Sequence, residues 1–483
     1  MSNKKKNQPI EKIGIPEGHR PPVTRRDFLK FGVIPFAGTV LVPNLIMQIL
    51  SRATAHAQTP AGTAGLCGAG SAGYIPFLVF DMAGGAALPG NFLVGKKGGP
   101  EDLLGSYDTL GWNPKNSGAI DKSFGVPMAG NNVSQILAGI KQTASAGAQA
   151  NLRMGTFCHF SQDDSQANRT SALTLVARAG LQGKFVQNGV GSINSLSGGN
   201  SDVALKEAMY KPNLVQNAED ISRSVSNGPA FEDMSDADIR QLSQAIYNMS
   251  ALQLKQFEGL SDGQKLAGLS DCGYKTNLSY GKIIQGLDHR RDSTINATQV
   301  YQNAQVSDDK GNGNQGSEMF ASIAYNVISG NVGPGAITIG GCDYHDGNSV
   351  RGNRKDLDMG RQIGAAVELA FRMKKPLFFQ LVTDGGVTSS PGTRDWTADS
   401  SLRSLTVIGY YNPNKAPEQR RLQVGEYTDG GTVNQNTLIG DDPSKVANAV
   451  LANYLSACGK IGEFEKTAQI AFRNADLDSV LIF

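Results

Sequence analysis

Five short apolar runs constrain the fold of this 483-residue chain more than any other feature. They occupy residues 74–80, 154–158, 336–339, 377–382 and 405–410, and each is followed by polar or glycine-rich residues. A strand that is apolar on successive residues has two apolar faces, like the central strands of a parallel sheet covered by helices. The runs therefore predict an α/β sandwich with a central, mostly parallel sheet.

The segments between the runs supply the helices. One apolar stripe at helical spacing comes just before the 377–382 run: Ile363, Val367, Ala370 and Phe371. Asp442-Pro443 is typical of a helix start, and we expect the helix that it opens to stop at Gly459. Residues 229–270 carry two helical patterns in succession, which predict a helical hairpin inserted into the α/β domain.

Residues 1–57 are predicted to be a twin-arginine export signal. The motif Thr24-Arg25-Arg26-Asp27-Phe28-Leu29-Lys30 is followed by an apolar run at 31–50 and by the cleavage-like site Ala55-His56-Ala57. The mature domain would span residues 58–483, without a further membrane span, in the periplasm or outside the cell. Its partner during export would be the twin-arginine translocase, which carries folded cargo. A retained anchor is the alternative, because the apolar run is long enough to cross a bilayer.

The formal charge of +2 comes from this signal, since residues 1–57 hold nine Lys or Arg against three Asp or Glu. Without that excess of six, the mature chain is near −4. Nucleic acid is not an expected partner, because its binding needs a basic face. Gly311-Asn312-Gly313-Asn314-Gln315-Gly316 matches a dinucleotide-binding pattern, but no buried strand precedes it, so we expect a plain loop there.

Five cysteines, Cys67, Cys158, Cys272, Cys342 and Cys458, would meet an oxidising compartment after export. They allow at most two disulfides with one thiol left over, and their pairing is open.

Polar side chains follow four of the predicted strands at the point where each strand ends. Asp81 and His159 follow the first two runs, Asp343 and His345 follow the third, and Asp384 follows the fourth. Ligands of open α/β sheets bind at the carboxyl edge, where the ends of parallel strands meet. Carboxylate and imidazole groups together suit zinc, manganese or a similar divalent ion.

Each of these residues also has an ordinary structural explanation. An Asp after a strand often caps the next helix, and a single His is often structural. Their common position at strand ends favours a shared site, because convergence at one edge is what a site requires.

At these residues the chain resembles a family of uncharacterised exported bacterial proteins in the alkaline phosphatase and sulfatase superfamily. The matching pieces are the signal, Phe80-Asp81-Met82-Ala83-Gly84-Gly85, Asn168-Arg169-Thr170, Gly340-Gly341-Cys342-Asp343-Tyr344-His345 and Thr383-Asp384-Gly385-Gly386. The resemblance covers most of residues 74–412 and implies an alkaline-phosphatase-like fold. It also implies that Asp81, Asp343 and His345 bind metal and that Thr170, or else Ser165, stands near the place of a hydroxyl nucleophile.

The chain departs from this pattern where imidazoles are expected. Thr393-Arg394-Asp395-Trp396-Thr397 replaces an Asp-His-Gly motif, and Asp384-Gly385 replaces Asp-His. After the signal only His159, His289 and His345 remain, too few for an ordinary two-metal phosphatase site. We therefore expect a degenerate site for one divalent ion or none, held by Asp81, Asp343, His345 and Asp384, with His159 as a further candidate.

Two functions follow from this expectation. The favoured one is binding of an envelope ligand or partner protein without turnover, because the missing histidines weaken the activation of a nucleophile more than they weaken ligand binding. The alternative is a metal-dependent phosphoester or sulfoester hydrolase in which Thr170 or Ser165 attacks the ester.

Replacing Arg25-Arg26 by Lys-Lys should leave the uncleaved precursor in the cytoplasm, because the export receptor reads the arginine pair. Cell fractionation with mass spectrometry tests this, and the wild-type mature protein should begin near Gln58. Normal amounts of mature variant in the periplasm would contradict the signal. An intact hydrophobic segment on the exported wild type would instead establish the anchor.

Overall fold

The structure is a computed structural model that describes residues 73–113, 119–162, 169–186, 189–192, 212–225, 286–307, 317–345, 347 and 349–483. A few isolated helical positions between residues 237 and 248 are also described. The predicted signal at 1–57, Ser165, residues 311–316 and nearly all of the predicted insertion at 229–270 lie outside the described residues.

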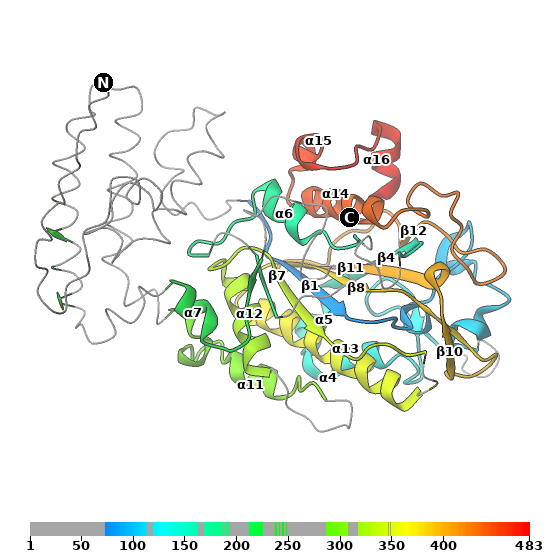
Figure 1. The fold of residues 1–483 in the computed structure, drawn as a ribbon, viewed down its shortest axis with the longest axis horizontal. Coiled ribbons are helices and arrows are strands. Elements are labelled where there is room, and N and C mark those ends of the chain that lie inside the picture. The colour runs from blue at the N-terminus through cyan, green and yellow to red at the C-terminus, as the bar shows by residue number, and fades with distance from the viewer. Residues whose placement is uncertain are drawn as a thin grey trace, which may run out of the picture.

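A single eight-stranded sheet runs through the described part of the chain (Figure 1). Its strand order is β12-β4-β11-β8-β1-β7-β5-β6. In that order the strands are β12 (Gln423–Val424), β4 (Leu152–His159), β11 (Ser404–Tyr411), β8 (Leu377–Thr383), β1 (Phe77–Met82), β7 (Gly335–Ile339), β5 (Val190–Gly191) and β6 (Asn213–Leu214).

The predicted α/β class with a mostly parallel sheet is confirmed, since β11 alone pairs antiparallel with its neighbours β4 and β8. The apolar run at 405–410 did not reveal this direction, because a strand buried on both faces is apolar whichever way it runs. The first predicted strand is displaced along the chain, since β1 begins at Phe77 rather than at residue 74. Asp81 therefore lies inside β1, opposite Thr338 and Val382.

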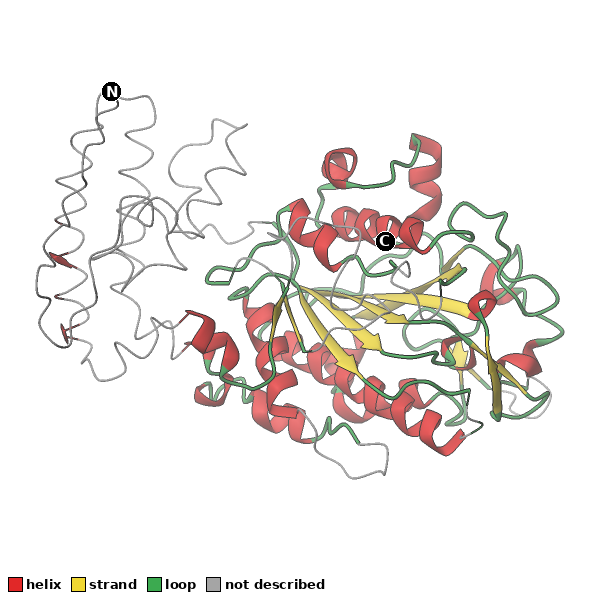
Figure 2. Ribbon diagram, in the orientation of Figure 1, coloured by secondary structure: helices red, strands yellow, loops and turns green. Residues whose placement is uncertain are grey.

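Helices cover both faces of the sheet (Figure 2). One face packs against α4 (Gln135–Thr143), α5 (Ala146–Ala150), α11 (Ala297–Gln302), α12 (Ser317–Ser329) and α13 (Ser349–Arg372). The other packs against α6 (Leu173–Ala179), α14 (Pro443–Ala457), α15 (Phe464–Thr467) and α16 (Asn474–Val480), while α7 (Asp220–Val225) lies beside the α12 end of the molecule in Figure 1.

The side chains of β1 alternate between the two helical layers. Leu78, Phe80 and Met82 belong to the apolar cluster that includes α13, while Phe77 and Val79 belong to the cluster that includes α14. Successive side chains of a strand point to opposite faces, so a central strand needs apolar residues on both. The same alternation directs Asp81 to the α14 face.

The two helices predicted from their sequence signals are α13 and α14. The Asp442 carboxylate accepts a hydrogen bond from the Ser444 backbone N–H at 2.8 Å and caps α14, and Gly459 follows its end with φ +67°. Along α13, Ile363, Val367 and Ala370 are buried as expected, but Phe371 is 40% exposed. Phe371 comes one residue after the buried Ala370, and that position turns toward solvent.

Two small hairpins complete the described fold. One pairs β2 (Ile120–Asp121) with β3 (Met128–Ala129), and the other pairs β9 (Val387–Ser389) with β10 (Trp396–Asp399). The β9–β10 hairpin follows β8 directly along the chain and leads into β11.

Of the five cysteines, Cys158, Cys342 and Cys458 are free thiols, and Cys67 and Cys272 lie outside the described residues. Within the described ranges, no helix has both the length and the apolar character that a bilayer crossing requires.

Gln380 in β8 should be a strong contributor to stability, because its buried amide fixes the chain before α6. Nε2 donates to the Thr170 carbonyl at 2.7 Å, and Oε1 accepts from the Ala172 N–H at 2.9 Å. Gln380→Leu should lower the free energy of unfolding by about 2–3 kcal/mol, since two buried hydrogen bonds are lost. Urea denaturation measures this, with exposed Gln435→Leu as the control. Equal stabilities of the two variants would contradict this role.

Candidate metal site

The carboxyl ends of β8, β1 and β7 lie next to one another, because the three strands are parallel neighbours. Backbone hydrogen bonds join the loops that follow β1 and β7. The Cys342 N–H donates to the Ala83 carbonyl at 3.1 Å, and the Tyr344 N–H donates to the Gly85 carbonyl at 3.2 Å. The loop that carries Asp343 is therefore fixed on both sides of that residue.

The end of β8 holds the loop after β1 from the side opposite to β7. The Thr383 hydroxyl donates to the Gly84 carbonyl at 2.6 Å and accepts from the Ala86 N–H at 2.9 Å. The Asp384 N–H also donates to the Gly84 carbonyl, at 3.0 Å. Gly84 has φ +121°, and a Cβ there would lie 2.5 Å from the Asp343 backbone nitrogen, so glycine is required at this position.

The β9–β10 hairpin brings another acidic residue, Asp399, to this edge. Asp399 ends β10 opposite Val387, and the Ser400 N–H donates to the Gly386 carbonyl at 2.8 Å. A Cβ on Gly85 would lie 3.1 Å from the Asp399 carboxylate, which shows how closely the hairpin approaches the loop after β1.

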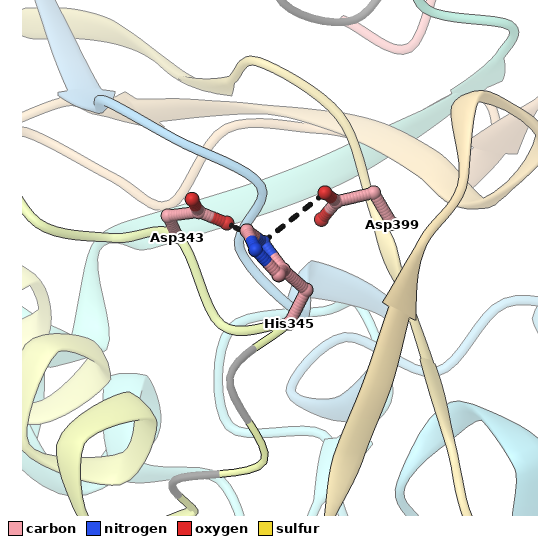
Figure 3. A group of neighbouring side chains, drawn as sticks. All are labelled: Asp343, His345 and Asp399. Atoms are coloured by element: carbon pink, nitrogen blue, oxygen red, sulfur yellow. Dashed lines mark hydrogen bonds and ion pairs between the residues drawn. The ribbon is translucent and has the colours of Figure 1, made fainter.

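Asp343, His345 and Asp399 form a compact group at this edge (Figure 3). One ligand atom from each residue lies within 4.8 Å of the others, an arrangement that can hold a metal ion. The side chains remain partly exposed, at 49%, 47% and 34% respectively. Solvent and small ligands therefore reach the group.

Both carboxylates approach the same imidazole nitrogen. His345 Nδ1 lies 3.1 Å from Asp399 Oδ2 and forms a second, short contact with Asp343 Oδ1. One ring nitrogen carries at most one proton, so it cannot make a full hydrogen bond to both oxygens. Arg351 donates to the Asp343 backbone carbonyl and places one positive charge beside the loop.

Of the four predicted metal ligands, the structure brings Asp343 and His345 into this group and leaves out Asp81 and Asp384. Asp81 is fully buried on the α14 face and accepts a hydrogen bond from the Thr338 hydroxyl at 3.0 Å. Asp384 is buried at the end of β8, where its backbone helps to hold Gly84.

His159 ends β4 and is fully buried, apart from the group. One ring nitrogen lies 2.8 Å from the Phe160 carbonyl, and the other lies 2.9 Å from the Thr406 hydroxyl. Burial lowers the pKa of His159 to about 4, because the cation would lose its hydration. A neutral imidazole with both nitrogens engaged is a structural residue.

Thr170, the first candidate nucleophile, is also fully buried, and its backbone carbonyl accepts from Gln380. Ser165, the second, lies outside the described residues. The sequence reasoning missed Asp399, which belongs to no buried strand. Its only local signal was its place at the end of a short polar strand after the 377–382 run.

Comparison with models of known protein families and with curated protein sequences finds no match.

Gly84→Ala should be strongly destabilising, because it combines an unfavourable φ with a clash against the Asp343 backbone. We expect the free energy of unfolding to fall by about 3 kcal/mol in urea titrations. Gly340→Ala is the matched control in the neighbouring loop, since a Cβ there meets nothing within 4 Å. The free energies of unfolding of the two variants should differ by more than about 2 kcal/mol. A smaller difference would show that the two loops move apart at little cost to make room for a methyl group.

Proposed function

We propose that Asp343, His345 and Asp399 bind one divalent metal ion, zinc, manganese or a similar ion, at the carboxyl edge of the sheet. The observation that carries this proposal is the approach of two carboxylates to one imidazole nitrogen. A proton on Nδ1 serves only one of the two oxygens, whereas a cation among the three ligand atoms is attracted to all of them. Carboxylate oxygen with imidazole nitrogen is a donor set used for zinc and manganese.

The charge of the group supports a cation as well. Asp343 and Asp399 bring two carboxylates to one imidazole ring. A divalent ion between them would relieve the repulsion between the two negative charges.

We propose further that the protein is an exported, alkaline-phosphatase-like binding protein that uses this ion to hold an anionic envelope ligand or an acidic partner. Three protein ligands leave coordination positions open, and the partial exposure of all three side chains gives access to them. Binding is favoured over turnover because Thr170 is fully buried and therefore badly placed to attack an ester.

A metal-dependent phosphoester or sulfoester hydrolase is the second candidate. The observation in its favour is the same set of three protein ligands with open positions, which is typical of catalytic metal sites. When bound, such an ion supplies a Lewis acid and lowers the pKa of a coordinated water. The protein residues would contribute the orientation of that ion and of the ester beside it.

The proposed location is the periplasm or the cell exterior, reached through the twin-arginine translocase. This part of the proposal rests on the sequence motif at Thr24 to Lys30 and on the cleavage-like site at Ala55 to Ala57.

Removing a ligand should lower metal content and thermal stability together. Protein purified from the periplasm should hold about one metal equivalent, and Asp343→Asn, His345→Ala and Asp399→Asn should each lose most of it, because each removes one of three ligands. Their melting temperatures should fall too, since an ion bound only by the folded state stabilises it. Elemental analysis and thermal melts with and without chelator measure both effects. Asp395→Asn, an exposed position in the same hairpin, is the control for charge.

Full metal content in the three variants would contradict the site, as would a metal-free wild type that is indifferent to added Zn²⁺, Mn²⁺ and chelator. A panel of phosphoesters and sulfoesters separates the two functions. Turnover that disappears in His345→Ala and survives in Asp395→Asn would establish the hydrolase in place of the binding protein.

A further inference from the structure

Tyr344 stands between two of the proposed metal ligands and is fully buried beneath them. Its hydroxyl donates to Asp356 Oδ1 at 2.9 Å, and its ring stacks on Trp396 with centroids 6.5 Å apart. Tyr344 is buried while Asp343 and His345 on either side of it stay partly exposed, so the two candidate ligands lie on the solvent side of the tyrosine.

Asp356 lies in α13 and is a fully buried carboxylate. Besides Tyr344, it accepts from Asn91 Nδ2 at 2.8 Å and from Arg394 Nη2 at 3.2 Å. Burial raises the pKa of Asp356, while Arg394, Asn91 and Tyr344 oppose that shift. A buried carboxylate of this kind depends on its partners, because a lone buried charge is costly.

Arg394 connects Asp356 to the hairpin that carries the third ligand. Its guanidinium donates from Nε to Asn353 Oδ1 at 3.0 Å and from Nη1 to the Gly90 carbonyl at 2.9 Å. It also lies over the Trp396 ring, 5.1 Å from the centroid, and Trp396 begins the strand that ends at Asp399.

The helix surface under the two rings is a glycine. A Cβ on Gly352 of α13 would lie 3.1 Å from Trp396 Nε1 and 3.2 Å from Tyr344 Cδ2. The rings therefore rest almost directly on the helix backbone. The loop with Asp343 and His345 and the hairpin with Asp399 are thus both fixed to one stretch of α13.

We propose that the buried Asp356–Arg394 pair is the positioning unit of the site, which sets the separation between the Asp343–His345 loop and the Asp399 hairpin. The inference rests on the proposed metal binding for its functional consequence, although the anchoring itself can be tested without metal. Tyr344 and Trp396 are positioning residues in this scheme, because they transmit the anchor to the ligands and do not touch the ion.

Positioning of this kind has a measurable effect on affinity. Residues that orient metal ligands typically change metal affinity about 10–100-fold when they are replaced. Asp356→Asn removes the charge that holds Arg394 and should weaken Zn²⁺ binding by about that factor. Tyr344→Phe keeps the ring and loses one hydrogen bond, so a smaller loss, about 3–10-fold, is expected.

The experiment titrates Zn²⁺ into metal-depleted full-length mature protein by calorimetry, well below each variant's melting temperature. Glu368→Gln is the matched control, since Glu368 is a largely buried carboxylate of the same helix, paired to Arg372 at 3.0 Å and bonded to the Ser145 N–H at 2.9 Å. It should lower stability and leave the Zn²⁺ affinity within about twofold, because it contacts neither the loop nor the hairpin. The Tyr344→Phe/Asp356→Asn double variant should bind no more weakly than Asp356→Asn alone, because the tyrosine hydroxyl acts through Asp356.

A second readout needs no metal. The chain has two tryptophans, so Trp112→Phe leaves Trp396 as the only indole reporter. In that background, Asp356→Asn and Arg394→Gln should make Trp396 more accessible to acrylamide, and Glu368→Gln should not. Unchanged quenching in Asp356→Asn and Arg394→Gln would overturn the anchoring.

The two proposals fail separately. Zn²⁺ affinity within about twofold of wild type in Asp356→Asn, with binding lost in Asp343→Asn, would overturn the positioning role and leave the metal site standing. A wild type that binds neither Zn²⁺ nor Mn²⁺ would overturn the metal site, and the quenching of Trp396 would then decide the anchoring by itself.

Discussion

The close approach of two backbones at Gly84 is the constraint on which the candidate site depends. Only glycine allows the loop after β1 to lie against the Asp343 backbone, and the hydrogen bonds of Thr383 and Asp384 to the Gly84 carbonyl hold it there. Three separate strand ends thereby become one surface. The arrangement depends on β8, β1 and β7 being neighbours in the sheet, although they lie far apart in the sequence.

Polar residues at this edge and in the helix beneath it fall into two groups, one buried and one exposed. Asp81, His159 and Asp356 are buried, and the hydrogen bonds that they make lie inside the protein. Asp343, His345 and Asp399 stay in contact with solvent. The buried residues favour one arrangement of the packed elements, because a buried polar side chain is stable only where its hydrogen-bond partners are in place. The exposed group is left to meet a ligand.

The sequence predicted the strands well, because a run that is apolar on both faces has few alternatives in a folded domain. It also predicted that Asp343 and His345 lie at the carboxyl edge of the sheet, because both residues come soon after a buried strand. It could not separate them from Asp81, because the sequence does not show that β1 continues to Met82 and therefore keeps Asp81 inside the buried sheet. Asp399 was beyond reach, since its approach to His345 depends on a hairpin whose position is set by tertiary contacts with α13.

The antiparallel direction of β11 has a consequence for how such a site can change. Because β11 runs opposite to β8, the connection between them begins and ends at the same edge of the sheet, and the hairpin with Asp399 lies wholly within it. A parallel strand in that place would have required the chain to cross to the opposite edge. The strand pairing therefore sets no limit on the length of this connection, and the position of the third ligand depends instead on the contacts of Arg394 and Trp396 with α13. The other two ligands depend on the strand ends, because backbone hydrogen bonds hold their loop to the loop after β1. A change of the third ligand would require no change in the strands, but it would have to preserve the contacts with α13.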